Sequence, residues 1–228
     1  TDQGGLVVAA RDGIYLSDHE GKEPKLLADI ESSQPSNRMN DAKCDPQGRL
    51  WAGTMAFDFA EGAASLYRIG ASGVERMLEG LTISNGLGWS PDAETMYFID
   101  SGNGRVDCFD FRSETGAIDN RRAFTEPLDG AMPDGLTVDR EGGVWVAFHG
   151  SGSVRRFSAN GELTAVVELP VSQVTSCCFG GEELGQLFIT TAAWKMSEAE
   201  LRAQPLAGSI FVCSPGVGGS SANRFATH

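Results

Sequence analysis

The amino-acid sequence predicts an all-β fold, a β-propeller built from four-stranded antiparallel blades, and three observations lead to this prediction. First, short apolar runs rich in β-branched and aromatic residues alternate with polar turns along the whole chain. Second, a unit of short strand, polar turn and stronger strand recurs at a period of about 40–50 residues. Third, two further strand-like segments follow each recurrence, which gives four strands per repeat, as in a propeller blade.

The repeat is clearest at four segments whose turn residues lie 45, 49 and 41 residues apart. The segments are 40–55, 85–100, 134–149 and 175–190, and their turn residues are Asp45, Ser90, Asp139 and Gly180. The opening "LVVAARDGIYLSD" also has strand character and adds one more blade. We therefore expect about five blades in a single domain that spans residues 1–228.

Within the repeat, the strongest strand signals are the apolar runs 50–56, 95–100, 144–148, 186–191 and 209–213. One helix is predicted near the end of the chain, over residues 196–204. Ser197 would cap its N-terminus, and Glu200 follows at the spacing of a capping box.

Composition restricts the partners of the protein. The net charge of −13 should repel DNA, RNA and anionic membranes and should favour cations in a cleft. No apolar run is long enough to span a membrane. The five cysteines lack Cys-x-x-Cys spacing, which indicates reduced, packed thiols in a cytoplasmic protein rather than disulfides or a zinc site. The sequence does not indicate an oligomeric state.

Polar residues recur in one register of the repeat. Five positions before each turn residue stand Asn40, Asn85, Asp134 and Thr175. Each would begin the innermost strand of its blade, so the four side chains would ring one mouth of the central channel. Amides, a carboxylate and a hydroxyl form an oxygen-donor set suited to calcium, magnesium or manganese. The alternative is that Asn and Asp at strand starts are turn formers that bond their own backbone.

At these residues the sequence resembles the family that includes regucalcin (senescence marker protein), bacterial gluconolactonases and luciferin-regenerating enzyme. Four motifs carry the resemblance, in order: "NRMNDAKCDPQGRLWAGTM", "ISNGLGWSPD", "MPDGLTVDREGGVWVA" and "VTSCCFGG". The resemblance implies a six-bladed β-propeller with one divalent metal ion in its channel. It also implies hydrolysis of a small sugar lactone, as in gluconolactonase.

The resemblance assigns roles to individual residues. Asn85 and Asp134 would bind the metal, which could be calcium, zinc, magnesium or manganese, and Asp134 would also be the general base. Arg38 and Asn40 match the substrate-binding residues of the family's "NRxND" motif. Asp58 lies where some members have a substrate-contacting Glu, although the local sequence differs, so Glu61 is an alternative.

One expected motif is missing. The family's third protein ligand is a Glu in an N-terminal "E-G/S-P-x-W" motif, which this sequence does not contain. Five blades without that motif fit a six-bladed protein that lacks its first blade. We therefore expect the domain to be incomplete at its N-terminus, with the metal site short of one anionic ligand.

The residues support lactone hydrolysis better than other chemistry. A divalent ion can polarise the ester carbonyl, Asp134 can take a proton from water, and Arg38 can stabilise the oxyanion. There is no Gly-x-Ser-x-Gly motif, and His149 is expected to be a strand-end histidine bonded to backbone. The remaining alternative is a propeller that binds a divalent metal, such as calcium, or a small ligand without catalysis.

The aromatic residues fall into two groups. The four tryptophans, Trp51, Trp89, Trp145 and Trp194, are expected to pack in the core rather than to stack on a ligand. Phe57 and Phe59 follow the strand 50–56 and could cover the mouth, where they would shape specificity.

Overall fold

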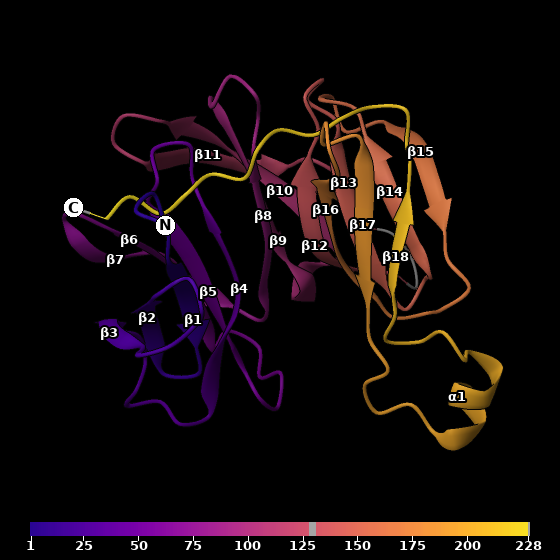
Figure 1. The fold of residues 1–228 in the computed structure, drawn as a ribbon, viewed down its shortest axis with the longest axis horizontal. Helices are drawn as coiled ribbons and strands as arrows, with labels where there is room; N and C mark the ends of the chain where they lie inside the picture. The colour runs from indigo at the N-terminus through magenta and orange to yellow at the C-terminus, as the bar shows by residue number, and fades with distance from the viewer. Residues whose placement is uncertain (128–130, 228) are drawn as a thin grey trace. The chain divides into compact units, whose positions relative to one another are not determined.

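Among the described residues, the strands form five antiparallel sheets, and in each sheet strands that are neighbours in the chain are also neighbours in the sheet (Figure 1). The structure, a computed structural model, describes residues 1–127 and 131–227. The five sheets are the blades of a β-propeller. The prediction of about five blades in this chain is therefore confirmed. The described residues contain no sixth blade, so the six-bladed architecture is not supported.

Three blades have four strands. The first contains β4 (Asn37–Cys44), β5 (Leu50–Ala56), β6 (Ala64–Gly70) and β7 (Gly73–Leu81). The second contains β8 (Ser84–Trp89), β9 (Thr95–Asp100), β10 (Arg105–Arg112) and β11 (Ala117–Ala123), with the 3₁₀ helix η1 (Ser101–Asn103) after β9. The third contains β12 (Met132–Val138), β13 (Val144–His149), β14 (Ser153–Phe157) and β15 (Leu163–Glu168).

The other two blades have three strands, which corrects the prediction of four strands in every blade. One contains β1 (Leu6–Ala10), β2 (Gly13–Ser17) and β3 (Lys25–Asp29). The other contains β16 (Val174–Gly180), β17 (Gln186–Thr191) and β18 (Ile210–Cys213), and α1 (Glu198–Ala203) lies between β17 and β18. The repeat was recognised from the strand pair around each turn, and that pair does not determine how many strands follow.

The chain divides into two compact units. The first unit comprises Thr1–Asn85, Phe111–Asp119 and the residues from Ala222 onward. The second comprises Gly86–Asp110 and Asn120–Ser221. The division passes through β8, β10 and β11, so Asn85 belongs to the first unit and Gly86 to the second.

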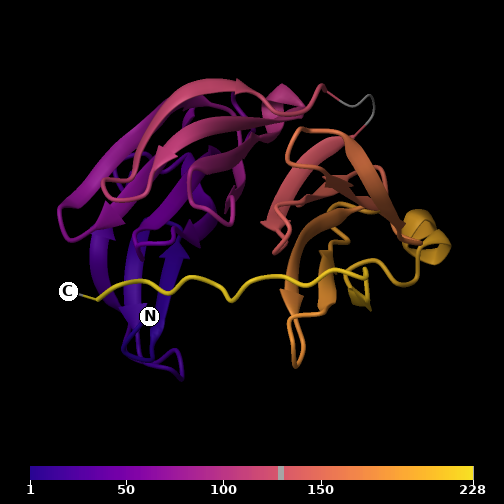
Figure 2. The same ribbon diagram turned by 90° about the horizontal axis from the view of Figure 1, so that it is seen from above.

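In the first unit, the C-terminal segment packs beside the N-terminus (Figure 2). The amide of Asp2 donates to the carbonyl of Phe225 at 2.9 Å, and the amide of Ala226 donates to the carbonyl of Gly48 at 2.9 Å. The buried Phe225 ring joins the apolar core that β1, β2, β4 and β5 share. Apolar burial therefore fixes the last residues of the chain onto the first unit.

A buried aspartate organises the turn between β4 and β5. Asp45 is fully buried and accepts hydrogen bonds from the backbone amide of Arg49 at 3.0 Å and from its guanidinium Nε at 2.6 Å. It also accepts a hydrogen bond from Nε1 of Trp51 at 3.0 Å. The carboxylate thus closes the turn and satisfies the polar atom of a buried indole, so that the ring can pack in the core.

The turn between β12 and β13 has the same arrangement in the second unit. Asp139 is 1% exposed and accepts from the amide of Gly143 at 2.8 Å and from Nε1 of Trp145 at 2.8 Å. Its arginine partner comes from a different place, because Arg156 of β14 donates its Nε at 2.7 Å. The core positions predicted for Trp51 and Trp145 are therefore confirmed, and Trp89 is buried as well.

The predicted elements agree closely with the observed ones. β5, β9 and β17 have the predicted bounds, and β13 and β18 differ from the prediction by one residue. The helix α1 is shorter than predicted, but both halves of the capping box form: Ser197 Oγ accepts from the amide of Glu200, and Glu200 Oε2 accepts from the amide of Ser197. Among the described residues, no helix has the length and apolar character that crossing a membrane requires.

The cysteines are all free, and the predicted burial holds for three of them. Cys44, Cys108 and Cys177 are buried, Cys213 is half-buried, and Cys178 is exposed. Cys178 is exposed because side chains alternate along β16, so that it points away from the core that holds Cys177. Burial raises the pKa of the Cys44 thiol to about 11, which makes it unreactive at neutral pH.

Candidate functional site

Arg38 and Asn40 lie next to each other on β4, and a hydrogen bond joins their side chains. Nη1 of Arg38 donates to Oδ1 of Asn40 at 3.0 Å and to the carbonyl of Met39 at 2.9 Å. Both side chains are half-buried, and burial lowers the pKa of the Arg38 guanidinium from its very high usual value. Arginine keeps its charge in proteins, so Arg38 remains a cation whose remaining N–H groups can meet a ligand.

A second hydrogen bond links this pair to β8. Nδ2 of Asn40 donates to the backbone carbonyl of Ser84 at 2.9 Å. The next residue is Asn85, which is 8% exposed. The approach of the neighbouring strands is close, because a Cβ at Gly53 of β5 would lie 1.8 Å from Oγ of Ser84. In the first unit the structure therefore brings Arg38, Asn40 and the strand position of Asn85 together.

Asp134 lies in the second unit, on β12, and its side chain is half-buried. The backbone around it is tightly packed: Ser101 Oγ donates to the carbonyl of Pro133 at 2.7 Å, and a Cβ at Gly86 would lie 2.6 Å from the carbonyl oxygen of Asp134. The glycines in Asn85-Gly86 and Asp134-Gly135 therefore allow innermost strands to approach. Asn85 and Asp134 lie within strands rather than turns, which contradicts the turn-former alternative for them.

Three of the predicted positions coincide with register shifts in the innermost strands. In β4 the shift lies between Met39 and Ala42 and includes Asn40. In β12 it lies between Pro133 and Leu136, and in β16 between Val174 and Ser176. A β-bulge redirects side chains that a regular strand would alternate between its two faces, and bulges are frequent next to active sites.

These shifts also explain an error in the predicted strand starts. The innermost strands begin before the polar residues, at Asn37, Ser84, Met132 and Val174. The polar residues therefore lie inside the strands and are held on both sides by backbone pairing. In the sequence, a polar residue ahead of an apolar run looks the same whether it starts a strand or forms a bulge.

Asp58 lies in the exposed loop after β5. Its Oδ1 accepts a hydrogen bond from the amide of Ala60 at 3.2 Å, so the carboxylate caps a turn in its own loop. Glu61 is also exposed. The role of either residue in substrate contact stays a prediction.

Phe57 of the same loop is held from two sides. Its amide donates to the carbonyl of Ser36 at 2.9 Å, and the guanidinium of Arg11 lies 5.2 Å from the ring centroid. Arg11 also donates to the carbonyl of Pro35 at 3.1 Å. The loop is therefore fixed to the segment that leads into β4.

Glu31 is a residue that the sequence analysis did not identify. Its carboxylate accepts hydrogen bonds from Asn37 Nδ2 at 2.8 Å, from Thr54 Oγ1 at 3.2 Å and from the Tyr67 hydroxyl at 2.9 Å. Burial and the bond to Glu31 raise the pKa of Tyr67. The backbone of Glu31 is in the left-handed region, with φ of 57°, which costs a non-glycine residue free energy. The three bonds offset that cost and fix the residue that precedes Arg38.

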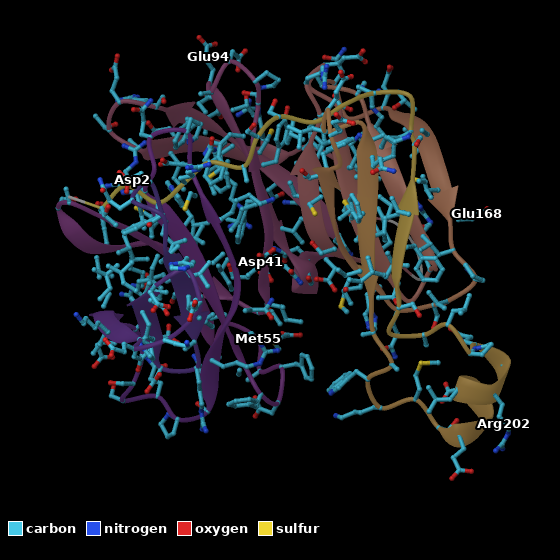
Figure 3. The ribbon with its side chains drawn as sticks, in the orientation of Figure 1. Asp2, Asp41, Met55, Glu94, Glu168 and Arg202 are labelled. Carbon is cyan, nitrogen blue, oxygen red and sulfur yellow. The ribbon has the colours of Figure 1, made fainter. Side chains whose placement is uncertain are left out.

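Asp41, next to Asn40, is a second residue with an altered environment. Burial raises the pKa of its carboxyl, while the charge of Lys43 and the bond from the amide of Ala42 at 2.7 Å act in the opposite direction. Figure 3 labels Asp41 on β4 and Met55 on β5, and Arg38 pairs with Met55 across these strands.

In the second unit, His149 ends β13 and pairs with Gln173 in an isolated bridge. Burial lowers the pKa of the imidazole, and its hydrogen bond to the Gln173 side chain acts in the opposite direction. His149 is thus a strand-end histidine with a backbone bridge, as predicted, and the Gln173 side chain is an additional partner. Trp194 contradicts the prediction of a core position, because it is 53% exposed, in the connection between β17 and α1.

The donor types of the two predicted ligands can be tested against the expected metal. Asn85 and Asp134 supply amide and carboxylate oxygens, which suit a hard divalent cation. Among the described residues, no group of three or more His, Cys, Asp or Glu side chains is arranged to hold a metal ion. By donor type alone, Asn85 and Asp134 fit an oxygen-ligated ion better than a nitrogen- or sulfur-ligated one.

The family profile described as the SMP-30/Gluconolactonase/LRE-like region matches residues 1–193. The chain belongs to this family. Regucalcin from Sus scrofa is 38% identical over 216 residues, which cover 91% of this chain and 72% of that protein. The family resemblance predicted from the four motifs is thereby confirmed.

Solved structures of family members are similar to this chain in fold. A calcium-binding regucalcin from Agrobacterium tumefaciens str. C58 has a TM-score of 0.94 and 30% identity, over 98% of this chain and 77% of that one. A luciferin-regenerating enzyme has a TM-score of 0.90 and 32% identity, over 98% of this chain and 78% of that one. A gluconolactonase from Xanthomonas campestris has a TM-score of 0.68 and 29% identity, over 82% of this chain and 65% of that one.

Proposed function

We propose that the protein is a metal-dependent lactonase that opens the ester of a small sugar lactone, with Asp134 as the general base. The observation that carries the proposal is the hydrogen-bonded line from Arg38 through Asn40 to the carbonyl next to Asn85. A site that only bound a metal would not need a half-buried cation held beside an amide at its edge. The gluconolactonase among the structural relatives supports the same reaction class.

Asn85 and Asp134 are the residues that would hold the divalent ion. When bound, the ion would polarise the ester carbonyl and lower the pKa of a nearby water. Asp134 takes a proton from the water while the oxygen of that water bonds to the carbonyl carbon of the lactone. Arg38 donates to the oxyanion that forms, and Asn40 holds a hydroxyl or the ring oxygen of the sugar. The bond between carbonyl carbon and ring oxygen then breaks, the ring oxygen takes the proton that Asp134 had accepted, and the hydroxy acid leaves and releases its carboxyl proton to water.

The donor set predicts weak retention of the metal. Asn85 is neutral, so Asp134 supplies the one negative charge of the two proposed ligands, and affinity of oxygen-ligated sites depends on ligand charge and number. We expect a chelator to remove the ion readily. Calcium, magnesium, manganese and zinc can then each be added to find which of them restores activity.

The test measures hydrolysis of a panel of sugar lactones through the acid that each reaction releases. The protein is treated with a chelator and then supplied with each metal in turn, and the Asp134→Ala variant is measured alongside. Turnover that returns with metal and is absent in Asp134→Ala supports the proposal. Metal binding without turnover on any lactone would overturn it.

The Arg38→Ala variant tests the substrate site separately. Removing a charged hydrogen-bond donor costs roughly 1.5–3 kcal/mol, which corresponds to a kcat/KM about 10- to 150-fold lower, through a higher KM for its contact with the substrate and a lower kcat for its contact with the oxyanion. An unchanged KM would remove Arg38 from the substrate site. A non-catalytic calcium-binding propeller is the second candidate, since the similar regucalcin from Agrobacterium tumefaciens is a calcium-binding protein. It predicts a higher melting temperature with metal and no lactone hydrolysis.

A further inference from the structure

Thr175 is the fourth polar residue of the repeated register, and the proposed function gives it no role. Asn40, Asn85 and Asp134 stand at the equivalent positions of the other innermost strands. Thr175 lies within β16, where the register of β16 against β17 shifts. A register shift of the same kind includes Asp134 in β12. Thr175 and Asp134 therefore occupy equivalent bulges.

The strands β12 and β16 approach each other beside these two residues (Figure 1). A Cβ on Gly135 would lie 2.9 Å from the Cα of Ser176 and 2.1 Å from its Oγ. Asp134 precedes Gly135 and Thr175 precedes Ser176, and consecutive Cα atoms are about 3.8 Å apart. Both residues belong to the second unit. A ligand with the size of a sugar ring at Asp134 is therefore within reach of Thr175.

The hydroxyl of Thr175 is hydrogen-bonded to that of Thr190 in β17, with 2.9 Å between the two Oγ1 atoms. Oγ1 of Thr190 also donates to the carbonyl of Ser176 at 3.4 Å. A hydroxyl has one proton to donate, and Thr190 gives its proton to Ser176. The direction of the bond between the two threonines follows, because Thr175 must then donate and Thr190 accept.

This direction makes the Thr175 hydroxyl an acceptor toward a ligand. Its proton is committed to Thr190, whereas a hydroxyl oxygen also has two lone pairs. Thr175 is half-buried, so its oxygen stays accessible to a small molecule. It can receive a hydrogen bond from a hydroxyl group, whereas an ether or carbonyl oxygen of a ligand has no proton to offer it.

Folding alone gives a weak reason for the two hydroxyls. Valine has nearly the shape of threonine and favours strands as strongly, and Thr190 is exposed, so core packing does not require either hydroxyl. A pair of threonines on neighbouring strands adds only modestly to the stability of a sheet. The fixed proton direction matters more to a ligand, because it determines which polar groups Thr175 can bind.

We propose that Thr175 is a specificity-determining residue that accepts a hydrogen bond from a ring hydroxyl of the lactone, and that Thr190 positions the Thr175 hydroxyl. The inference rests on the proposed function for its choice of ligand. Sugar lactones carry hydroxyls around the ring, and each can donate. A site built to bond a hydroxyl discriminates against a ligand that lacks it, because the polar group of the site then loses its partner.

The first experiment measures ligand binding without hydrolysis. The probe is 1,5-anhydroglucitol, a sugar ring without an ester, and its Kd is obtained by ligand-observed NMR titration. We expect Thr175→Val, which keeps the shape and removes the acceptor, to raise Kd roughly 3- to 10-fold, and Thr175→Ser to restore most of the loss. The control is Thr164→Val, because Thr164 is exposed on the outer strand β15 of the same unit. Its Kd should equal that of the unchanged protein.

The second experiment is kinetic, uses D-glucono-1,5-lactone and tests Thr190 as a positioning residue. Thr190→Val releases the proton of Thr175, so the hydroxyl can rotate, and we expect KM to rise roughly two- to threefold with kcat unchanged. Added to Thr175→Val, the same change should cause no further rise, because Thr190 acts through Thr175. Additive rises in KM would overturn the positioning role of Thr190. Melting temperatures confirm that each variant is folded.

The outcomes separate this inference from the proposed function. Lactone turnover with unchanged Kd and KM in Thr175→Val would overturn the inference and leave the lactonase in place. Binding of 1,5-anhydroglucitol that weakens in Thr175→Val, without turnover on any lactone, would support the hydroxyl contact and overturn the lactonase. No binding of 1,5-anhydroglucitol to the unchanged protein would also overturn the inference, because a site that recognises ring hydroxyls does not need the ester.

Discussion

The blade β4–β7 of the first unit and the blade β12–β15 of the second are alike at one end and different at the other. At the turn after the innermost strand, each has a buried aspartate bonded to a tryptophan indole and an arginine: Asp45 with Trp51, and Asp139 with Trp145. At the bulge near the start of the innermost strand, one blade has Asn40 and the other has Asp134. The repeated end is explained by folding alone.

The differing end requires another explanation. A bulge exposes whichever side chain it carries without needing a particular one for packing, so its residue can vary from blade to blade. Different oxygen donors at equal positions would let one fold present a mixed set of ligands. We infer that the proposed function depends on the bulge positions, where the repeat is broken, whereas the buried turns, where the repeat is kept, maintain the fold.

The sharpest way to test this division is the Asp134→Asn variant. Asparagine keeps the shape and an oxygen donor but cannot take a proton from water, so turnover should fall by about 10²- to 10⁴-fold. Because the side chain is half-buried and the shape is kept, the melting temperature should change little. The measurements are lactone turnover and thermal unfolding, each with and without metal.

Two results would contradict this assignment. Near-normal turnover in Asp134→Asn would show that another group takes the proton. A large loss of stability would show that Asp134 belongs with the folding residues, as Asp139 does.

The converse change is Asp139→Ala at the repeated end. It leaves the Arg156 guanidinium and the Trp145 indole without their acceptor in a buried turn, and breaking a buried pair in this way costs about 3–5 kcal/mol. We expect a marked loss in the free energy of unfolding, measured in urea, with KM unchanged in the fraction that remains folded. The exposed turn residue Asp92 serves as control, and Asp92→Ala should unfold at nearly the same urea concentration as the unchanged protein.

The pH dependence of unfolding tests independently how much the Asp139 carboxylate stabilises the fold. Burial raises the pKa of Asp139, but the hydrogen bonds from Arg156, Trp145 and the Gly143 amide outweigh it, so the pKa lies below its usual value. A lowered folded pKa stabilises the fold above the unfolded value of about 3.9, and this contribution is lost as pH falls through the folded pKa. The unchanged protein should therefore lose stability more steeply below about pH 4 than Asp139→Ala does.

The sequence was informative where the structure repeats and less so where contacts join distant segments. Asp45, Asp139 and the strands around them could be predicted, because a turn residue before an apolar run has a local signature. The bulges could not be predicted, since one extra residue in a strand leaves no mark in composition. Neither could Glu31, whose three partners lie on three different strands.

Variants of Glu31 test whether its hydrogen bonds stabilise the start of β4, where the blades differ. Glu31→Ala removes the acceptor shared by Asn37, Thr54 and Tyr67 and should cost about 1–3 kcal/mol of stability and raise KM, because the start of β4 loosens beside Arg38. Glu31→Gly also removes the side chain but relieves the left-handed backbone, so it should be more stable than Glu31→Ala by about 1 kcal/mol. Equal stability of the two variants would mean that the backbone of residue 31 is not strained.

The smallest effect is expected at the loop after β5, where Asp58 and Glu61 compete for one proposed role. Both are exposed, and the carboxylate of Asp58 already caps the turn at Ala60, so neither is held toward Arg38 by the fold. We expect Asp58→Ala and Glu61→Ala each to change KM by less than about threefold, because exposed, mobile charges contribute little binding free energy. A tenfold rise in KM for one variant alone would identify that residue as a substrate contact. It would also show that the functional positions of this blade include the loop after β5 as well as the bulge of β4.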